Sequence, residues 1–84
     1  MARYTVVLTK RAEKQLDKLA NNVAEPIIAS LQQLSIDPRP FGYKKLKGRA
    51  GFRIRVGNYR IIYDIIDNQL IVEIIEIGNR KDIY

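Results

Sequence analysis

Hydrophobic and polar residues alternate along residues 52–63, and the alternation is interrupted once, at Gly57-Asn58. Period-two alternation predicts β-strands, and a two-residue loop that tolerates positive φ predicts a tight hairpin between them. Such a loop sets these pairs opposite one another: Val56 with Tyr59, Arg55 with Arg60, Ile54 with Ile61, and Phe52 with Tyr63. Because side chains alternate between faces, one face is apolar and the other, expected to be polar, carries Arg53, Arg55 and Arg60.

Upstream, the apolar spacing changes to that of helices. After a short apolar strand at residues 4–8, Thr9 is placed to cap a first helix with apolar positions at i, i+4 and i+7. Asn22, followed three residues later by Glu25, resembles a capping box and predicts that a second helix begins there, with Pro26 in its first turn. Two amphipathic helices with so short a link predict an antiparallel helical hairpin.

Downstream, the period returns to two. Residues 45–47 predict a short edge strand, and residues 70–77, apolar on nearly both faces, predict a central strand covered on one side by the helices. Asp67-Asn68 is a plausible two-residue turn before that last strand, although a longer loop also fits. The sequence therefore predicts one α+β domain over residues 1–84: an N-terminal strand, an antiparallel helical hairpin, then an antiparallel β-sheet.

The net charge of +6 is concentrated in one part of the chain. Seven of the 15 basic residues lie between residues 44 and 60, where no acidic residue occurs, and the other eight face nine acidic residues, a balance of −1. Such a patch favours a phosphate-rich partner, most often nucleic acid, although a solvated basic face is the simpler alternative. The opposed Arg55 and Arg60 favour binding, because like charges directly across a sheet cost roughly 0.2–1 kcal/mol.

Several classes of site are excluded by composition. The chain has no cysteine and no histidine, which removes disulfides, thiolate zinc sites and the commonest general base. A magnesium site built from carboxylates alone stays possible, but no acidic cluster suggests one, so we expect neither metal nor cofactor. No apolar run is long enough to span a membrane, and residues 1–4 do not begin a signal peptide. We therefore expect a cytoplasmic protein.

Three segments in order, over essentially all 84 residues, resemble a known family. They are Lys45-Leu46-Lys47-Gly48, residues 52–63, and the C-terminal stretch Ile77-Gly78-Asn79-Arg80-Lys81-Asp82-Ile83-Tyr84. The chain resembles the RelE/ParE superfamily of toxins from bacterial and archaeal toxin–antitoxin pairs. The resemblance implies a RelE-like toxin fold and a cognate small acidic antitoxin, RelB-like, as partner.

The superfamily has two functional branches, so the fold alone does not give the activity. RelE-like members are ribosome-dependent endoribonucleases that cut mRNA in the decoding site, whereas ParE-like members poison DNA gyrase without catalysis. The RelE branch carries basic residues on the hairpin, an arginine after the last strand and a tyrosine close behind. This chain has Arg53, Arg55, Arg60, Arg80 and Tyr84 at those places, with arginine where RelE-type enzymes often have lysine at the first two.

The resemblance implies a metal-independent cleavage in which the ribose 2′-OH attacks the adjacent phosphorus. Arg60 with Arg55 is expected at the scissile phosphate, Arg53 at that phosphate or a neighbouring one, Arg80 near the leaving group, and Tyr84 as the base. The residues expected to contact RNA or the ribosome are Lys44, Lys45, Lys47, Arg49 and Lys81. Glu73 and Glu76 are alternative bases on sequence grounds, but glutamates on strands are more often solvated or paired with arginine.

Two other functions are weighed against this one. A ParE-like gyrase poison shares the fold, and the five matching positions favour the RelE branch over it. A plain nucleic-acid-binding module is disfavoured because single-strand binders usually display several stacking rings, and only 8% of this chain is aromatic.

Overall fold

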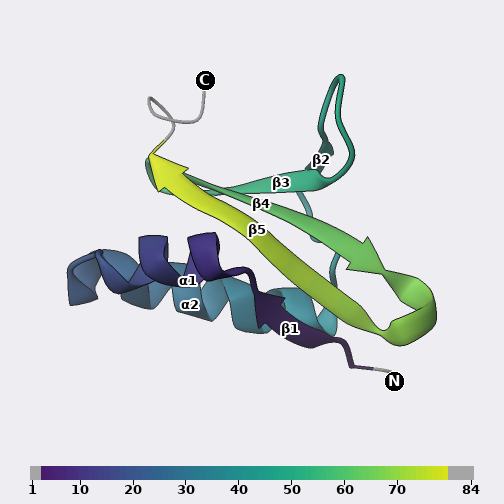
Figure 1. Cartoon of the computed structure of the whole chain (residues 1–84), viewed down its shortest axis with the longest axis horizontal. Helices are drawn as coiled ribbons and strands as arrows, with labels where there is room; N and C mark the ends of the chain where they lie inside the picture. The colour runs from purple at the N-terminus through teal and green to yellow at the C-terminus, as the bar shows by residue number, and fades with distance from the viewer. Residues whose placement is uncertain (1–2, 80–84) are drawn as a thin grey trace.

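The computed structural model describes residues 3–79 as two helices against one face of a five-stranded sheet (Figure 1). In chain order the elements are β1 (Thr5–Leu8), α1 (Lys10–Asp17), α2 (Asn21–Ile36), β2 (Lys44–Lys45), β3 (Phe52–Val56), β4 (Tyr59–Ile66), the 3₁₀ turn η1 (Asp67–Gln69) and β5 (Ile71–Asn79). The α+β architecture predicted from the pattern is confirmed. Within the described range, neither helix combines the length and hydrophobicity that a membrane-spanning helix needs.

The sheet is mixed, with the strand order β1-β5-β4-β3-β2. Strands β2 to β5 form the expected antiparallel succession, whereas β1 pairs in parallel with β5, Thr5 opposite Ile71 and Leu8 opposite Ile74. Both helices and strands β2 to β4 lie between β1 and β5 in the chain, which provides the long connection that a parallel pair requires, because a tight turn cannot join parallel strands. Figure 1 shows both helices running beneath the sheet, with β5 between β1 and β4.

Helix α1 begins as the sequence predicts. The side chain of Thr9 accepts a hydrogen bond from the Ala12 backbone N–H at 3.2 Å, which satisfies one of the free donors at the helix start. The same hydroxyl donates to the Ile75 carbonyl of β5 at 3.0 Å, and the Gln15 Oε1 atom accepts from the Ile77 N–H at 2.7 Å. Since β1 pairs only with the first half of β5, side chains of α1 supply hydrogen-bond partners for backbone groups at the edge of its second half.

Helix α2 begins earlier than its sequence suggests. Ala20 is the N-cap, without a side-chain hydrogen bond, and its carbonyl accepts from the N–H groups of Val23 and Ala24. The predicted capping box at Asn22 is therefore wrong, and Pro26 lies inside the helix rather than in its first turn. Asn22 is exposed, so water can satisfy the carbonyl that Pro26, which lacks an N–H, leaves without a donor.

The core lies between the helices and the covered face of the sheet. Its buried members are Ala12, Ile27, Leu31, Leu34, Ile54, Ile61, Tyr63, Val72, Ile74 and Ile77. The Tyr63 hydroxyl donates to the Pro38 carbonyl at 2.7 Å, which fastens the loop after α2 to the core, and burial raises the pKa of Tyr63 to about 12. The face predicted to be apolar from the hairpin alternation is thus the buried one.

The β4–β5 connection differs from the two-residue turn at Asp67-Asn68. Residues Asp67–Gln69 form a 3₁₀ turn, and Leu70 adopts a left-handed conformation with φ 55°. Further along, the register shifts between Ile62 and Tyr63, so that Ile75 is an extra residue in β5. This β-bulge lets Val72, Ile74 and Ile77 all face the core despite their uneven spacing.

Candidate active site

The β3–β4 hairpin has the predicted register. Arg55 lies directly opposite Arg60, and Val56 opposite Tyr59. In the connecting loop Gly57 has a φ of 59° while Asn58 does not enter the positive region, the pattern of a type II′ turn. A tight turn of this kind fixes which residues face one another, so the two arginines are set opposite by local geometry.

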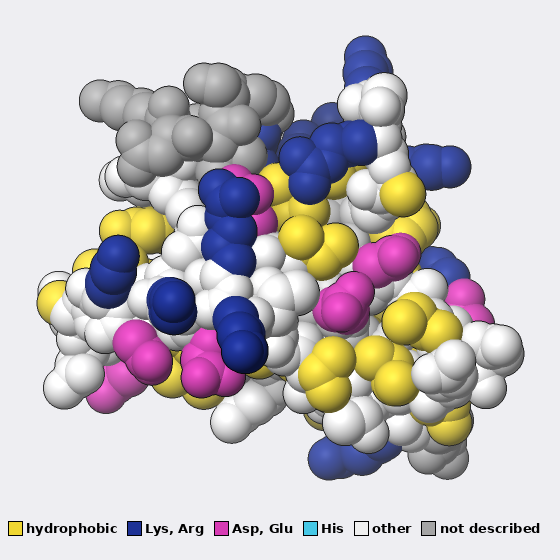
Figure 2. Space-filling view, in the orientation of Figure 1, with side chains coloured by type: hydrophobic (Ala, Val, Ile, Leu, Met, Phe, Trp, Pro, Cys, Tyr) yellow, Lys and Arg dark blue, Asp and Glu magenta, His cyan; other side chains and the backbone are white. Residues whose placement is uncertain are grey.

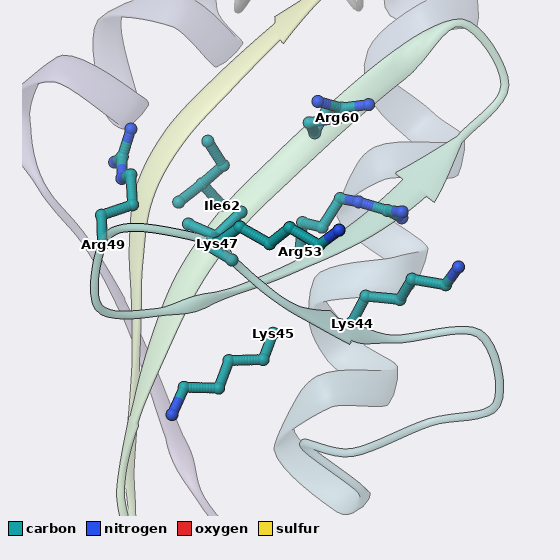
Figure 3. Close-up of a pocket in the computed structure, with 8 residues that line it drawn as sticks. Lys44, Lys45, Lys47, Arg49, Arg53, Arg60 and Ile62 are labelled. Carbon is teal, nitrogen blue, oxygen red and sulfur yellow. The ribbon is translucent and has the colours of Figure 1, made fainter.

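A pocket of about 560 Å³ lies on the face of the sheet away from the helices (Figure 3). It is lined by Lys44, Lys45, Leu46, Lys47, Arg49, Arg53, Arg60 and Ile62. Six of these eight residues are basic and none is acidic. We call this the basic pocket. Such a concentration of cations attracts phosphate groups, and the low-dielectric floor strengthens that attraction.

Strand β2 and the loop after it build one wall of the basic pocket. Lys44 pairs with Arg53, so the two side chains share a face, whereas Lys45 points away from them (Figure 3). The loop is closed by a hydrogen bond from the Leu46 N–H to the Gly51 carbonyl at 3.0 Å. Gly51 has a φ of 112°, a conformation that side-chain-bearing residues rarely adopt.

Arg60 forms the floor of the pocket and is only 1% exposed. Arg60 thus lies on the predicted polar face with Arg53 and Arg55, but the expectation that it is exposed there is wrong: Arg53 is half-buried, Arg55 is exposed and Arg60 is buried. Arg60 sits on a strand with neighbours on both sides, and its partner on β5 is Gly78. A glycine at that position places no side chain beside the guanidinium. The period-two pattern gives no sign of this role for Gly78.

Arg55 is not among the residues that line the basic pocket. It borders a second, smaller hollow of about 190 Å³ on the side of β3 that faces the end of α2. The other residues around it are Ser30, Gln33, Leu34, Pro40, Phe41 and Ile54. Each hollow therefore has one member of the opposed pair, Arg60 in the basic pocket and Arg55 in the smaller one, which we call the Phe41 hollow.

The two glutamates of β5 lie outside the basic pocket. Glu76 is 3.7 Å from the Arg11 Nη2 atom of α1, and Glu73 stands opposite Asp64 of β4 and Val7 of β1. Pairing with an arginine, expected as the more common role of strand glutamates, is what Glu76 shows. Figure 2 shows Lys and Arg side chains over β2 and its loop and further ones over the helices, whereas the sheet surface below β2 shows acidic and hydrophobic side chains.

A separate network of charged and polar side chains connects the residue before β1, the loop after α2 and the β4–β5 connection. The Asp67 carboxylate accepts hydrogen bonds from the Tyr4 hydroxyl at 2.6 Å and from the Arg39 guanidinium at 2.9 Å. Both donors stabilise the ionised carboxylate, so they hold the pKa of Asp67 below its usual value. This network is exposed and none of its three residues lines the basic pocket, which indicates a structural role.

Of the ten residues predicted to form the site, the structure brings six around one pocket and sets Arg55 beside it. Arg80, Lys81 and Tyr84 lie outside the described residues, so their roles stay predictions. Strand β5 ends at Asn79, whose partner Tyr59 directly precedes Arg60.

Comparison with known proteins identifies the family. Residues 6–84 match the family described as ParE toxin of type II toxin–antitoxin system, parDE. The chain is 34% identical to Toxin RelG of Mycobacterium tuberculosis, covering 96% of this chain and 95% of that protein. It is 30% identical to mRNA interferase toxin RelE of Escherichia coli strain K12, covering 93% and 84% respectively.

A solved structure agrees with these relatives. A chain in the crystal structure of the toxin–antitoxin complex RelBE2 from Mycobacterium tuberculosis superposes with a TM-score of 0.81 at 32% identity. The match covers 93% of this chain and 99% of that one. The chain therefore belongs to the RelE branch of the RelE/ParE superfamily of type II toxin–antitoxin toxins.

Proposed function

We propose that this protein is the toxin of a type II toxin–antitoxin pair and inhibits translation as an mRNA endoribonuclease that acts on the ribosome without a metal. The observation that carries the proposal is the basic pocket, with Arg60 fixed in its floor and Arg53 at its wall. The relative in E. coli K12 that is named an mRNA interferase shares 30% of its residues with this chain over nearly the whole length.

The proposed reaction is an internal transesterification. The ribose 2′-oxygen bonds to the adjacent phosphorus, the 2′-OH proton goes to a base, and the bond to the 5′-oxygen of the next nucleotide breaks as that oxygen takes up a proton. Extra negative charge develops on the phosphoryl oxygens. Arg60 and Arg53 are suited to stabilise it, because a guanidinium stays charged and binds two oxygens with its planar fork.

The acid and base are proposed from the family resemblance. Tyr84 is the proposed base, because the resemblance places a tyrosine shortly after the last strand in that role. Arg80 is proposed to stabilise the leaving oxygen by its charge, because a guanidinium does not readily give up a proton. Arg55, opposite Arg60, completes the proposed group around the scissile phosphate.

The remaining basic residues are proposed to hold RNA by its backbone. They are Lys44, Lys45, Lys47, Arg49 and Lys81. Contacts to phosphates add affinity without sequence choice. The ribosome then supplies the substrate geometry, since correct positioning removes a large part of a reaction barrier. Free RNA is accordingly expected to be a poor substrate.

The proposed regulator is a small acidic RelB-like antitoxin. The structural relative comes from a toxin–antitoxin complex, and the excess positive charge of this chain lies between residues 44 and 60. An acidic chain that covers this segment neutralises the pocket. Toxin, antitoxin and ribosome would meet in the cytoplasm.

The test is a map of mRNA 5′ ends on translating ribosomes after the purified protein is added, beside a gyrase supercoiling assay. Cuts in ribosome-bound mRNA, with none in free mRNA, support the proposal. Inhibited supercoiling without cuts contradicts it and favours the alternative, a ParE-like gyrase poison. Deletion of Tyr84 should lower cleavage by roughly 10²–10⁴ without loss of ribosome binding.

A further inference from the structure

Phe41 is the most exposed large hydrophobic residue of the described structure, with an exposed fraction of 107%. It lies in the turn formed by residues 40–43, which is closed by a hydrogen bond from the Tyr43 N–H to the Pro40 carbonyl at 3.0 Å. Gly42 has a φ of 90°, as the third residue of a type II turn requires. Phe41 therefore occupies the second position of the turn and projects into solvent.

The turn is held in place by contacts on its N-terminal side. The buried Tyr63 hydroxyl donates to the Pro38 carbonyl at 2.7 Å, and the Asp37 carboxylate accepts from the Arg39 N–H at 3.0 Å. These bonds anchor the backbone that carries Phe41, while the ring packs on nothing in the described chain. A ring held out on an anchored turn loses little conformational freedom when a ligand stacks on it.

The surroundings of Phe41 favour an anionic ligand with a flat group. None of the residues around the Phe41 hollow is acidic, and Arg55 borders it. On β4, Arg60 stands directly opposite Arg55 and lines the basic pocket. The Cα atoms of directly opposed residues lie about 4.5–5.5 Å apart, so the two hollows each contain one of two closely neighbouring residues. A chain of nucleotides can therefore place a phosphate in one and a base at the other.

We propose that Phe41 is a stacking platform for an unpaired base of the substrate RNA, next to the phosphate bound at Arg60. This proposal rests on the nuclease function proposed above and names a contact of that same site. The basic residues next to the exposed ring favour a partner that carries both anionic and flat groups, and each nucleotide of an RNA supplies one phosphate and one base. Arg55 would hold the phosphate between the stacked base and the basic pocket.

The test is the affinity for a short unpaired RNA with 2′-O-methyl riboses, which cannot be cleaved, measured by fluorescence anisotropy at low salt. Stacking of one base on an aromatic ring changes affinity by roughly 5–150-fold when the ring is removed. We expect Phe41→Leu to lose affinity in that range and Phe41→Trp to retain it. Ile36→Ala, a change at another exposed apolar residue that is 42% exposed, should bind as the unchanged protein does.

An RNA of the same length without bases separates stacking from phosphate binding. Phe41→Leu and the unchanged protein should bind that RNA equally. Equal loss on both RNAs, a Trp variant as weak as the Leu variant, or no binding by the unchanged protein would overturn the proposal. So would a Leu variant that binds RNA normally but has lost affinity for the antitoxin, because Phe41 would then belong to a protein interface.

The same proteins are also tested for mRNA cleavage on ribosomes. If the unchanged protein cleaves mRNA and Phe41→Leu binds RNA as well as the unchanged protein does, the stacking contact is refuted and the nuclease function is supported. If Phe41→Leu loses affinity only for the RNA that has bases, and the unchanged protein does not cleave mRNA, the stacking contact is supported and the nuclease function is refuted.

Discussion

Replacement of Arg60 with methionine removes its charge while retaining a long side chain in the floor of the basic pocket. Arg60 is 1% exposed and stands opposite Arg55. Loss of one group that stabilises transition-state charge costs about 10²–10³ in rate, or about 2.7–4 kcal/mol. We therefore expect cleavage by Arg60→Met to fall by that factor.

The free energy of unfolding of Arg60→Met, unlike its cleavage rate, should not fall. Truncation to alanine would leave a cavity in a buried position, but methionine fills most of the same space. Replacement of a buried charged group by an apolar one of similar volume is often neutral or stabilising, and the substitution also relieves repulsion worth roughly 0.2–1 kcal/mol. Stability should thus stay equal or rise while activity is lost.

The assays are single-turnover cleavage of mRNA on programmed ribosomes and urea unfolding followed by circular dichroism. Lys14→Met, on the exposed side of α1, removes the same charge outside the pocket and should leave cleavage unchanged. Full cleavage by Arg60→Met would refute the assignment. So would a loss of stability large enough that the unfolded fraction alone explains the lost activity.

Three further changes test interactions that hold the fold together. Gly51→Ala should destabilise by about 1–3 kcal/mol in urea titrations, because its φ is 112° and a methyl group would lie 3.1 Å from a β4 carbonyl oxygen. Gln15→Met should cost about 1 kcal/mol and speed hydrogen exchange at the Ile77 N–H, which loses its acceptor. Asp67→Asn should be less stable than the unchanged protein at neutral pH, and thermal melts should show the difference vanish in acid. The sign follows from the depressed pKa of Asp67: its contribution is present above the ordinary value of 3.8 and disappears as the pH falls through the lower folded-state value.

Local sequence determined the features that depend on a few neighbouring residues. Gly57 and the period-two pattern around it were enough for the β3–β4 register, and Thr9 was enough for the start of α1. The same local reasoning was wrong at Asn22, because α2 begins at Asn21 with Ala20 as its N-cap and the helix is held by Ala24 and Ile27 in the core. Where packing and a capping motif disagree, burial of several side chains outweighs one hydrogen bond.

The hairpin of β4 and β5 could be predicted only in part from local patterns. Glu73 and Glu76 are three residues apart, which breaks strict alternation and is the sign that a β-bulge leaves in a sequence. The bulge at Ile75 explains why strict alternation makes the strand look apolar on nearly both faces, although Val72, Ile74 and Ile77 all face the core. Its position was not predictable, because it is fixed by pairing with β4 rather than by residues within β5.

Only the tertiary structure decided how distant segments meet at the site. The sequence by itself established the basic segment and the opposition of Arg55 and Arg60, since both depend on nearby residues. That Arg60 is buried, that Gly78 lies beside it, and that Arg55 borders a different hollow depend on strands that pair across the whole sheet. Burial of a side chain depends on all the elements packed around it. The parallel pairing of Thr5 with Ile71 joins residues from opposite ends of the chain, so no local pattern in the sequence predicts it.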